Sequence, residues 1–191
     1  MALPTNKIKV MELTDVAIYE MTADSGVGPT YGEPIPIAGI VKVGISPEMA
    51  TAELEGDGSI LDVFAKMKSA EVSIEAAYLN MDVLAIVSGV TVTTTGTTPN
   101  QVASYEVDKD SRPKWFKVEG RWQYPGLGLG SVNFCLHKCK ATDPGAIEVT
   151  DGSEFGGQTI TAKAVPTEST GKIYKVDAHE TAADLSGASS P

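Results

Sequence analysis

The sequence contains few of the cysteines and histidines that many catalytic and metal sites use. Among its 191 residues there are only two cysteines and two histidines. It also lacks the nucleophile elbow of a hydrolase and the Lys-Ser or Lys-Thr pair of a P-loop. These absences argue against catalysis, and we expect a protein that is not an enzyme and holds no cofactor or metal.

Basic residues are scarce as well. The chain has 15 lysines and arginines against 25 acidic residues, a formal net charge of −10. Proteins that bind nucleic acids need clustered basic side chains to neutralise phosphates. The charge therefore argues against ordinary nucleic-acid binding, although it suits a surface that must avoid adhering to nucleic acid.

Long apolar runs are absent too. No window approaches the ~18 apolar residues that indicate a membrane-spanning helix, and the first residues, MALPTNKIKVMELTDV, lack the apolar core of a signal peptide. We expect a protein that is made and kept in the cytoplasm, unless something other than a signal sequence releases it. At this length a single compact domain can fold without disulfides or metals.

Turn-forming residues between short alternating segments are plentiful. The chain contains 19 glycines and 11 prolines, and alternation of apolar and polar residues predicts strands over 7–22, 40–55, 59–68, 70–79, 90–101 in part, 102–108, 114–124, 131–142, 156–167 and 171–180. We expect 40–55 to be two strands broken at Ser46-Pro47, because proline cannot donate to a sheet ladder. The pattern predicts a mainly β fold, an antiparallel sandwich or barrel of about ten strands with one short flanking helix.

The remaining segments predict how the chain is organised. Residues 1–180 are expected to form a single domain. Its Gly/Pro-rich segment 23–39 and its Thr-rich segment 90–101 are predicted to be long loop arms, since most connections have about 4–6 residues. The small polar segment 181–191 is predicted to be a disordered tail.

The one predicted helix covers about 80–88. Asn80 is a good N-cap, because its side chain can accept a hydrogen bond from a free backbone N–H. Asp82 lies near the positive end of the helix dipole, and Gly89 is a natural end. A helix this short must pack on the sheets to be stable.

A hairpin is predicted over residues 48–67. Asp57-Gly58 can supply the positive φ angles of a two-residue turn, which places Glu53 opposite Asp62. Like charges directly opposite one another destabilise a hairpin. The acids are therefore either an ordinary solvated face or a face that must repel a polyanion.

Three short patterns could indicate chemistry, and each has a simpler interpretation. On one strand Cys135, His137 and Cys139 would share a face, but the two sulfurs would lie about 13 Å apart at ~3.3 Å per residue, too far for one zinc ion or a disulfide. The GLGLG stretch at 126–130 is interpreted as a loop between strands. His179, with Asp177 and Ser186 nearby, adjoins a polar tail and is not interpreted as catalytic.

The order of elements resembles one known family. An acidic strand ending AELEGDG, a returning strand, and then AEVSIEAAYLNMDVLAIVSG resemble the major tail proteins, or tail tube proteins, of long-tailed bacteriophages. The later WFKVEGRW, VNFCLHKCKAT and ITAKAVPTESTGKIYKV resemble that family's second half. The similarity is one of pattern and covers most of residues 7–178.

The resemblance implies a structural role in the virion tail. Six copies would form a ring, the rings would stack into a tube, and double-stranded DNA would pass through the lumen without specific binding. Partners would be other copies of the chain, the tape-measure protein, a tail terminator, and a distal tail or baseplate protein. Glu53, Glu55 and Asp62 are the candidate lumen-facing acids.

A non-enzymatic carbohydrate-binding or decoration module is the alternative. Trp115, Trp122 and Tyr124 could supply a stacking platform for a sugar. Strand alternation, however, is expected to place the two tryptophans on opposite faces, which weakens a shared platform.

Overall fold

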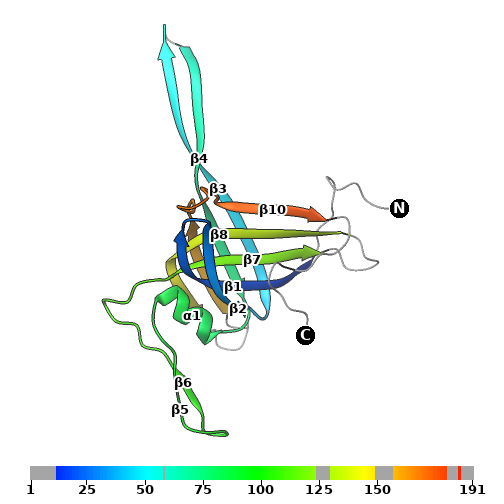
Figure 1. Ribbon diagram of the computed structural model, residues 1–191, viewed down its shortest axis with the longest axis vertical. Helices are drawn as coiled ribbons and strands as arrows, with labels where there is room; N and C mark the ends of the chain where they lie inside the picture. The colour runs from blue at the N-terminus through cyan, green and yellow to red at the C-terminus, as the bar shows by residue number, and fades with distance from the viewer. Residues whose placement is uncertain (1–11, 58, 124–129, 149–156, 180–184, 186–191) are drawn as a thin grey trace.

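The computed structural model describes residues 12–57, 59–123, 130–148, 157–179 and 185. Within them it has ten strands and one helix (Figure 1): β1 (Glu12–Ser25), β2 (Gly28–Pro36), β3 (Ile40–Gly56), β4 (Ser59–Ala76), α1 (Met81–Ser88), β5 (Thr93–Thr95), β6 (Val102–Ser104), β7 (Trp115–Gln123), β8 (Ser131–Glu148), β9 (Gly157–Ala164) and β10 (Tyr174–His179). All strand pairs are antiparallel. The predicted mainly β fold with one short helix is confirmed. None of the described helical residues forms a segment long and apolar enough to cross a membrane.

Eight of the strands form one sheet, in which β8 links two layers. The order is β2-β1-β7-β8-β9-β4-β3, with β10 also paired to β8. One edge of β8 pairs with β7. Its other edge pairs first with β10, over Ser131–Leu136, and then with β9, over Cys139–Glu148. β8 therefore belongs to both layers.

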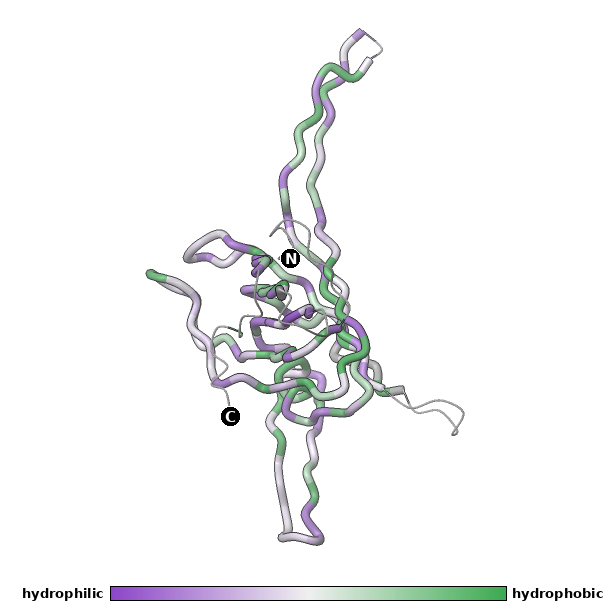
Figure 2. The backbone as a smooth tube through the Cα atoms, turned by 90° about the vertical axis from the view of Figure 1, so that its right-hand side faces the viewer, coloured by the Kyte–Doolittle hydropathy of each residue, from purple (hydrophilic) through white to green (hydrophobic). Residues whose placement is uncertain are grey.

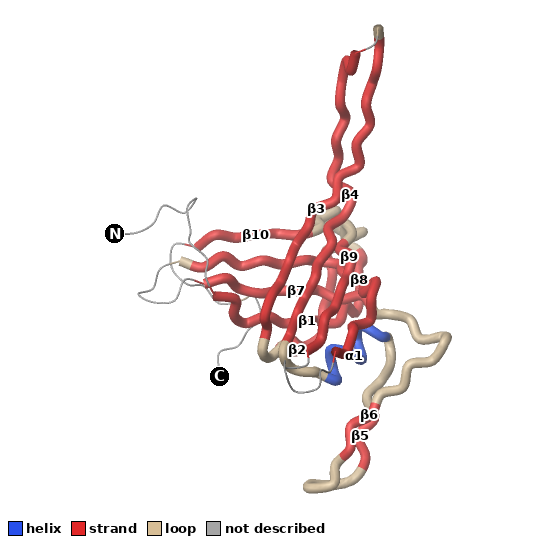
Figure 3. The backbone as a smooth tube through the Cα atoms, turned by 180° about the vertical axis from the view of Figure 1, so that it is seen from behind, coloured by secondary structure: helices blue, strands red, loops and turns tan. Residues whose placement is uncertain are grey.

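The two layers cross and enclose the core. In Figure 1, β1, β7, β8 and β10 run across the view, and β3, β4 and β9 run steeply behind them; Figure 3 shows the second layer from its own side. Alternate residues of each strand point inward, as a sheet buried on one face requires. The core contains Val16, Ile18, Val72, Ile74, Phe116, Val118, Phe134, Leu136, Ile160 and Ala162, together with Val83, Leu84 and Val87 of the helix.

The helix has the predicted ends. The Asn80 side chain accepts hydrogen bonds from the backbone N–H groups of Asp82 and Val83, at 3.0 and 3.3 Å. Gly89 adopts φ 74° and donates its N–H to the Ala85 carbonyl, which ends the helix. A Cβ at Gly89 would also lie 1.6 Å from the Arg112 carbonyl oxygen, so this position needs glycine both for its φ and for the close approach of the chain.

Two predictions about strand breaks are wrong. The expected loop over 23–39 is instead the turn of the β1–β2 hairpin followed by strand β2. The break at Ser46-Pro47 is absent, since β3 is continuous and Pro47 still pairs with Ala70. Both errors have the same cause. β2 and β3 are edge strands, and a strand at an edge accepts proline where the backbone nitrogen points away from the paired strand.

Two hairpins project from opposite ends of this body. The long β3–β4 hairpin extends at one end of the longest axis, and the short β5–β6 hairpin, within the segment 90–114, extends at the other (Figures 1 and 2). The predicted arm over 90–101 is thus an extended segment that includes β5. Of the predicted tail 181–191, only Leu185 is described, and it is buried.

Gly89 allows a test of the connection between the helix and the second hairpin. Gly89→Ala should lower the free energy of unfolding by about 3 kcal/mol, because left-handed strain of ~1–2 kcal/mol adds to a clash with backbone. Gly26→Ala is the matched control: its φ is 65°, but nothing lies within 4 Å of the added Cβ. Gly26→Ala should therefore lower the free energy of unfolding only by the left-handed strain of ~1–2 kcal/mol. Equal losses of unfolding free energy for the two variants in urea denaturation would contradict a clash between the added Cβ and Arg112.

Candidate assembly surface

The outer part of the β3–β4 hairpin, residues 48–67, stands away from the body and is called the ribbon here. β9 pairs with β4 only from Ala70 to Ala76, and β3 pairs only with β4. Each strand of the ribbon therefore has one edge that no described strand covers. The predicted turn is confirmed for Asp57, which has φ 52°, and Gly56 pairs with Ser59 across it.

Large apolar side chains are exposed along the ribbon. The six concerned are 53 to 63 % exposed: Met49, Leu54, Ile60, Leu61, Val63 and Phe64. Val63 and Phe64 are adjacent in a strand and so point to opposite faces. Figure 2 shows apolar and polar residues interspersed along both strands. An isolated two-stranded hairpin is at best marginally stable in water, and a ribbon with apolar residues on both faces is suited to lie between other elements.

The three candidate lumen acids lie on the ribbon, but not on one face of it. Glu53 pairs with Val63, and Leu54 pairs with Asp62, because a register shift next to Leu61 moves the ladder by one residue. The predicted Glu53–Asp62 opposition is therefore wrong. Cross-strand partners share a face, so Glu53 and Glu55 point to one side and Asp62 to the other. All three side chains are exposed. Because they lie on opposite faces of the ribbon, they cannot all face the lumen from the same surface.

The root of the ribbon is fixed to the body by Glu48. Its Oε2 accepts from the Ser69 hydroxyl at 2.5 Å and lies 2.6 Å from Lys163 Nζ on β9. Lys68 Nζ lies 3.8 Å from Oε1. The hydrogen bond from Lys163, followed by that from Ser69, lowers the pKa of Glu48 to about 2. This cluster joins the ribbon to β9 where the body ends.

A second polar cluster lies on the outer face of β7 and β8. Lys117 and Glu119 form an ion pair at 2.8 Å, and both side chains are buried. The Lys117 ammonium lies 3.7 Å from the centre of the Tyr19 ring and 5.1 Å from that of Tyr31. Burial, together with Glu119, raises the pKa of Tyr19 to about 12. The β1–β2 hairpin covers both groups, which no short pattern in the sequence indicates.

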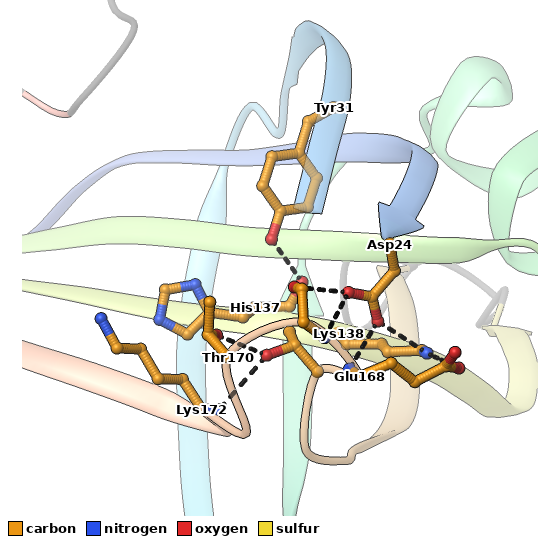
Figure 4. A network of polar contacts seen from close by, with 9 residues as sticks. Asp24, Tyr31, His137, Lys138, Glu168, Thr170 and Lys172 are labelled. Carbon is orange, nitrogen blue, oxygen red and sulfur yellow. Dashed lines mark hydrogen bonds and ion pairs between the residues drawn. The ribbon is translucent and has the colours of Figure 1, made fainter. Parts of the chain in front are cut away.

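The same hairpin is tied down at its far end (Figure 4). The Tyr31 hydroxyl donates to the His137 carbonyl at 2.8 Å. Asp24 accepts from Lys138 Nζ and from the Glu168 backbone N–H, each at 2.9 Å, and from the Ser169 hydroxyl at 2.8 Å. The Glu168 N–H and then Lys138 hold the pKa of Asp24 well below its usual range. The segment 23–39, predicted to be a loop arm, is thus part of the body.

The cysteine–histidine pattern does not form a reactive or metal-binding site in the described part of the chain. A register shift between Phe116 and Val118 turns Cys139 into the core, away from Cys135. Cys135 Sγ lies 3.7 Å from His137 Nδ1. Burial, with Glu119 next, raises the pKa of Cys135 to about 12, whereas an activated thiol needs a lowered pKa. No group of three His, Cys, Asp or Glu residues there could hold a metal ion.

The other two short patterns are only partly within the described residues. Asp177 and His179 line a pocket of about 350 Å³ with Cys135 and His137, and Ser186 lies outside the described residues. Burial lowers the pKa of His137. The GLGLG stretch lies outside the described residues except for Gly130.

The aromatic platform of the alternative function is not assembled either. The Trp122 ring packs on Phe134, with ring centres 4.5 Å apart. Trp115 lies on the other face of β7, with Lys138 and Lys140 ammonium groups about 5 Å from its ring centre. Tyr124 lies outside the described residues. The two tryptophans are therefore separated as predicted.

The ribbon root predicts a pH dependence. The pKa of Glu48 is lowered from 4.5 to about 2 in the folded chain. The ionised carboxylate therefore stabilises the fold fully above about pH 4.5, and this stabilisation is lost as the pH falls through about 2. In Lys163→Met, an NMR titration of the Glu48 carboxyl should show its midpoint moving up toward the ordinary value. Lys42→Met is the control, since Lys42 contacts Glu75 instead. An unchanged midpoint would contradict the role of Lys163.

The environments of Cys139, which is buried, and Cys135, which is half-buried, predict low thiol reactivity. Neither Cys135 nor Cys139 should react measurably with a thiol reagent in the folded protein at pH 8, because burial raises the pKa of both. Both should react in denaturant. Labelling of Cys135 in the folded chain at the rate of a free thiol would show that its environment has been misjudged.

Comparison with known proteins adds no assignment. A scan against protein-family models and a search of curated proteins found no match to this chain. The functional inference therefore rests on the geometry of the ribbon and the body.

Proposed function

We propose that the chain is the structural subunit of a phage tail tube. In this proposal, six copies form a ring and the rings stack into the conduit through which double-stranded DNA is delivered. The observation that carries the proposal is the ribbon: a two-stranded extension with uncovered edges and large apolar side chains on both faces. Such an element gains stability only when other chains cover it.

The placement of the two hairpins supports an assembly that grows in one direction. The ribbon and the β5–β6 hairpin extend from opposite ends of the longest axis. A subunit with extensions at both ends can contact neighbours on both sides, and repeated head-to-tail contacts produce rings or open filaments. The terminal copies would meet the tail terminator and the distal tail or baseplate proteins, and the lumen would hold the tape-measure protein before DNA passes.

The register limits which acids can face the lumen. If the ribbon contributes to the inner wall, either Glu53 with Glu55 or Asp62 faces the DNA, because they lie on opposite faces. In a six-fold ring each acid recurs six times and forms a negative band. Such a band discourages phosphates from adhering to the wall.

The carbohydrate-binding or decoration module has less support. It needs a shared aromatic surface, but Trp115 and Trp122 lie on opposite faces of β7, and Trp122 packs on Phe134. An exposed apolar ribbon also has no role in a monomer that binds sugars.

The proposal predicts that assembly depends on the ribbon. The purified full chain should form rings or tubes in negative-stain electron microscopy as its concentration rises. Replacing residues 51–65 by Asn-Gly joins the cross-strand partners Ala50 and Lys66 through a two-residue turn, and this variant should remain a folded monomer. A second variant keeps the ribbon's length but replaces Leu61, Val63 and Phe64 with threonine, which retains strand propensity; it should also fail to assemble.

The control is Val27→Thr, which changes a fully exposed apolar residue in the β1–β2 turn and should assemble like the wild type. Normal tubes from either ribbon variant would refute the role of the ribbon. A full chain that stays monomeric at every concentration and binds glycans would favour the alternative function.

A further inference from the structure

The body of the protein has one sheet edge that differs from the others. β2 and the body part of β3 are edge strands, and both contain prolines: Pro29, Pro34 and Pro36 in β2, and Pro47 in β3. Prolines at a sheet edge discourage pairing with another chain. β10, with the sequence YKVDAH, pairs with β8 on one side and contains neither proline nor glycine. Among the described strands, β10 is thus a body edge without this protection.

The core also reaches the surface at β10. Val176 pairs with Phe134, whose side chain is buried in the core, so the two point to the same face. Phe134 is 1 % exposed, whereas Val176 is 49 % exposed. The core layer therefore ends at β10 with an uncovered valine, and a further strand beside β10 would cover it.

The ribbon has the complementary properties. Over 48–56 and 59–67 its two strands have uncovered edges without proline, and it is too thin to be stable alone. Its outer half has the acids Glu53, Glu55, Asp57 and Asp62 and no basic residue. Two ribbon tips therefore repel one another. The β10 side has two exposed lysines, Lys172, just before the strand, and Lys175, which forms an ion pair with Asp177 of the same strand.

We propose that the edge of β10 that no described strand covers accepts the ribbon of a second copy of this chain as an added strand. Backbone hydrogen bonds extend the sheet, and apolar ribbon side chains cover Val176, as in other cases of strand addition. This inference rests on the proposed function, since it names the partner surface of the same ribbon.

The first test is Val176→Lys, compared with Val41→Lys on the edge strand β3, where the valine is 66 % exposed. A lysine on the uncovered valine places a charge where the ribbon must pack. We expect the critical concentration for assembly, measured by sedimentation, to rise about tenfold or more for Val176→Lys and to stay at the wild-type value for Val41→Lys. Wild-type assembly by Val176→Lys would overturn the inference.

The second test does not depend on how the lysine variant folds. A size-tagged Val176→Cys chain is mixed with an untagged Val63→Cys chain and oxidised, with Val102→Cys on the other hairpin as the control. We expect a mixed-size disulfide product with Val63→Cys only. A product that joins two Val176→Cys chains and no mixed product would show that β10 pairs with β10 and would overturn the inference.

The two proposals can fail separately. If the wild-type chain forms no rings or tubes, the proposed function fails, whereas a mixed disulfide product would still support pairing of the ribbon with β10. If the wild type assembles but Val63→Cys does not cross-link to Val176→Cys, only the pairing proposal fails.

Discussion

The structure depends on the fact that one strand, β8, pairs with both layers. Its first half lies between β7 and β10, and its second half continues beside β9. The side chains of Phe134 and Leu136 therefore close the core from one layer, while β9 positions Lys163 to hold the ribbon root through Glu48. The register shift within β8 that allows this change of neighbours also turns Cys139 inward and leaves Cys135 on the polar outer face. The core, the outer polar cluster and the direction of the ribbon are thus linked through a single strand.

The body and the ribbon follow different physical rules. In the body, even charged groups are buried with partners, as Lys117 is with Glu119 and Lys138 is with Asp24, and such pairs are costly to break once buried. In the ribbon, apolar groups are exposed and backbone edges are uncovered. A chain that pairs the buried charges of one region gains nothing in folding from leaving the apolar groups of another region exposed, and this contrast supports the proposal that other chains cover the ribbon.

Local signals predicted part of this arrangement. Asn80, Gly89 and Asp57 each act within a few residues, and all three have the predicted roles, because caps and tight turns depend on local geometry. The errors come from features that depend on neighbours. Pro47 does not break β3 because β3 lies at an edge, and Asp62 does not face Glu53 because of a register shift beside Leu61. The buried Lys117–Glu119 pair under Tyr19 and Tyr31 required the fold of the β1–β2 hairpin over the sheet, which no short pattern indicates.

The acids at the ribbon tip have a consequence for the newly made chain. A long, uncovered hairpin with a Val-Phe pair is a typical starting point for fibrous aggregation. Glu53, Glu55, Asp57 and Asp62 give the tips of all copies the same charge within a few residues of those apolar side chains. Charged residues that flank an aggregation-prone strand act as gatekeepers. When two ribbon tips approach one another, their carboxylates repel, and at ordinary salt concentrations this repulsion extends over about 10 Å. The same few carboxylates are therefore expected to oppose aggregation of newly made chains before they assemble.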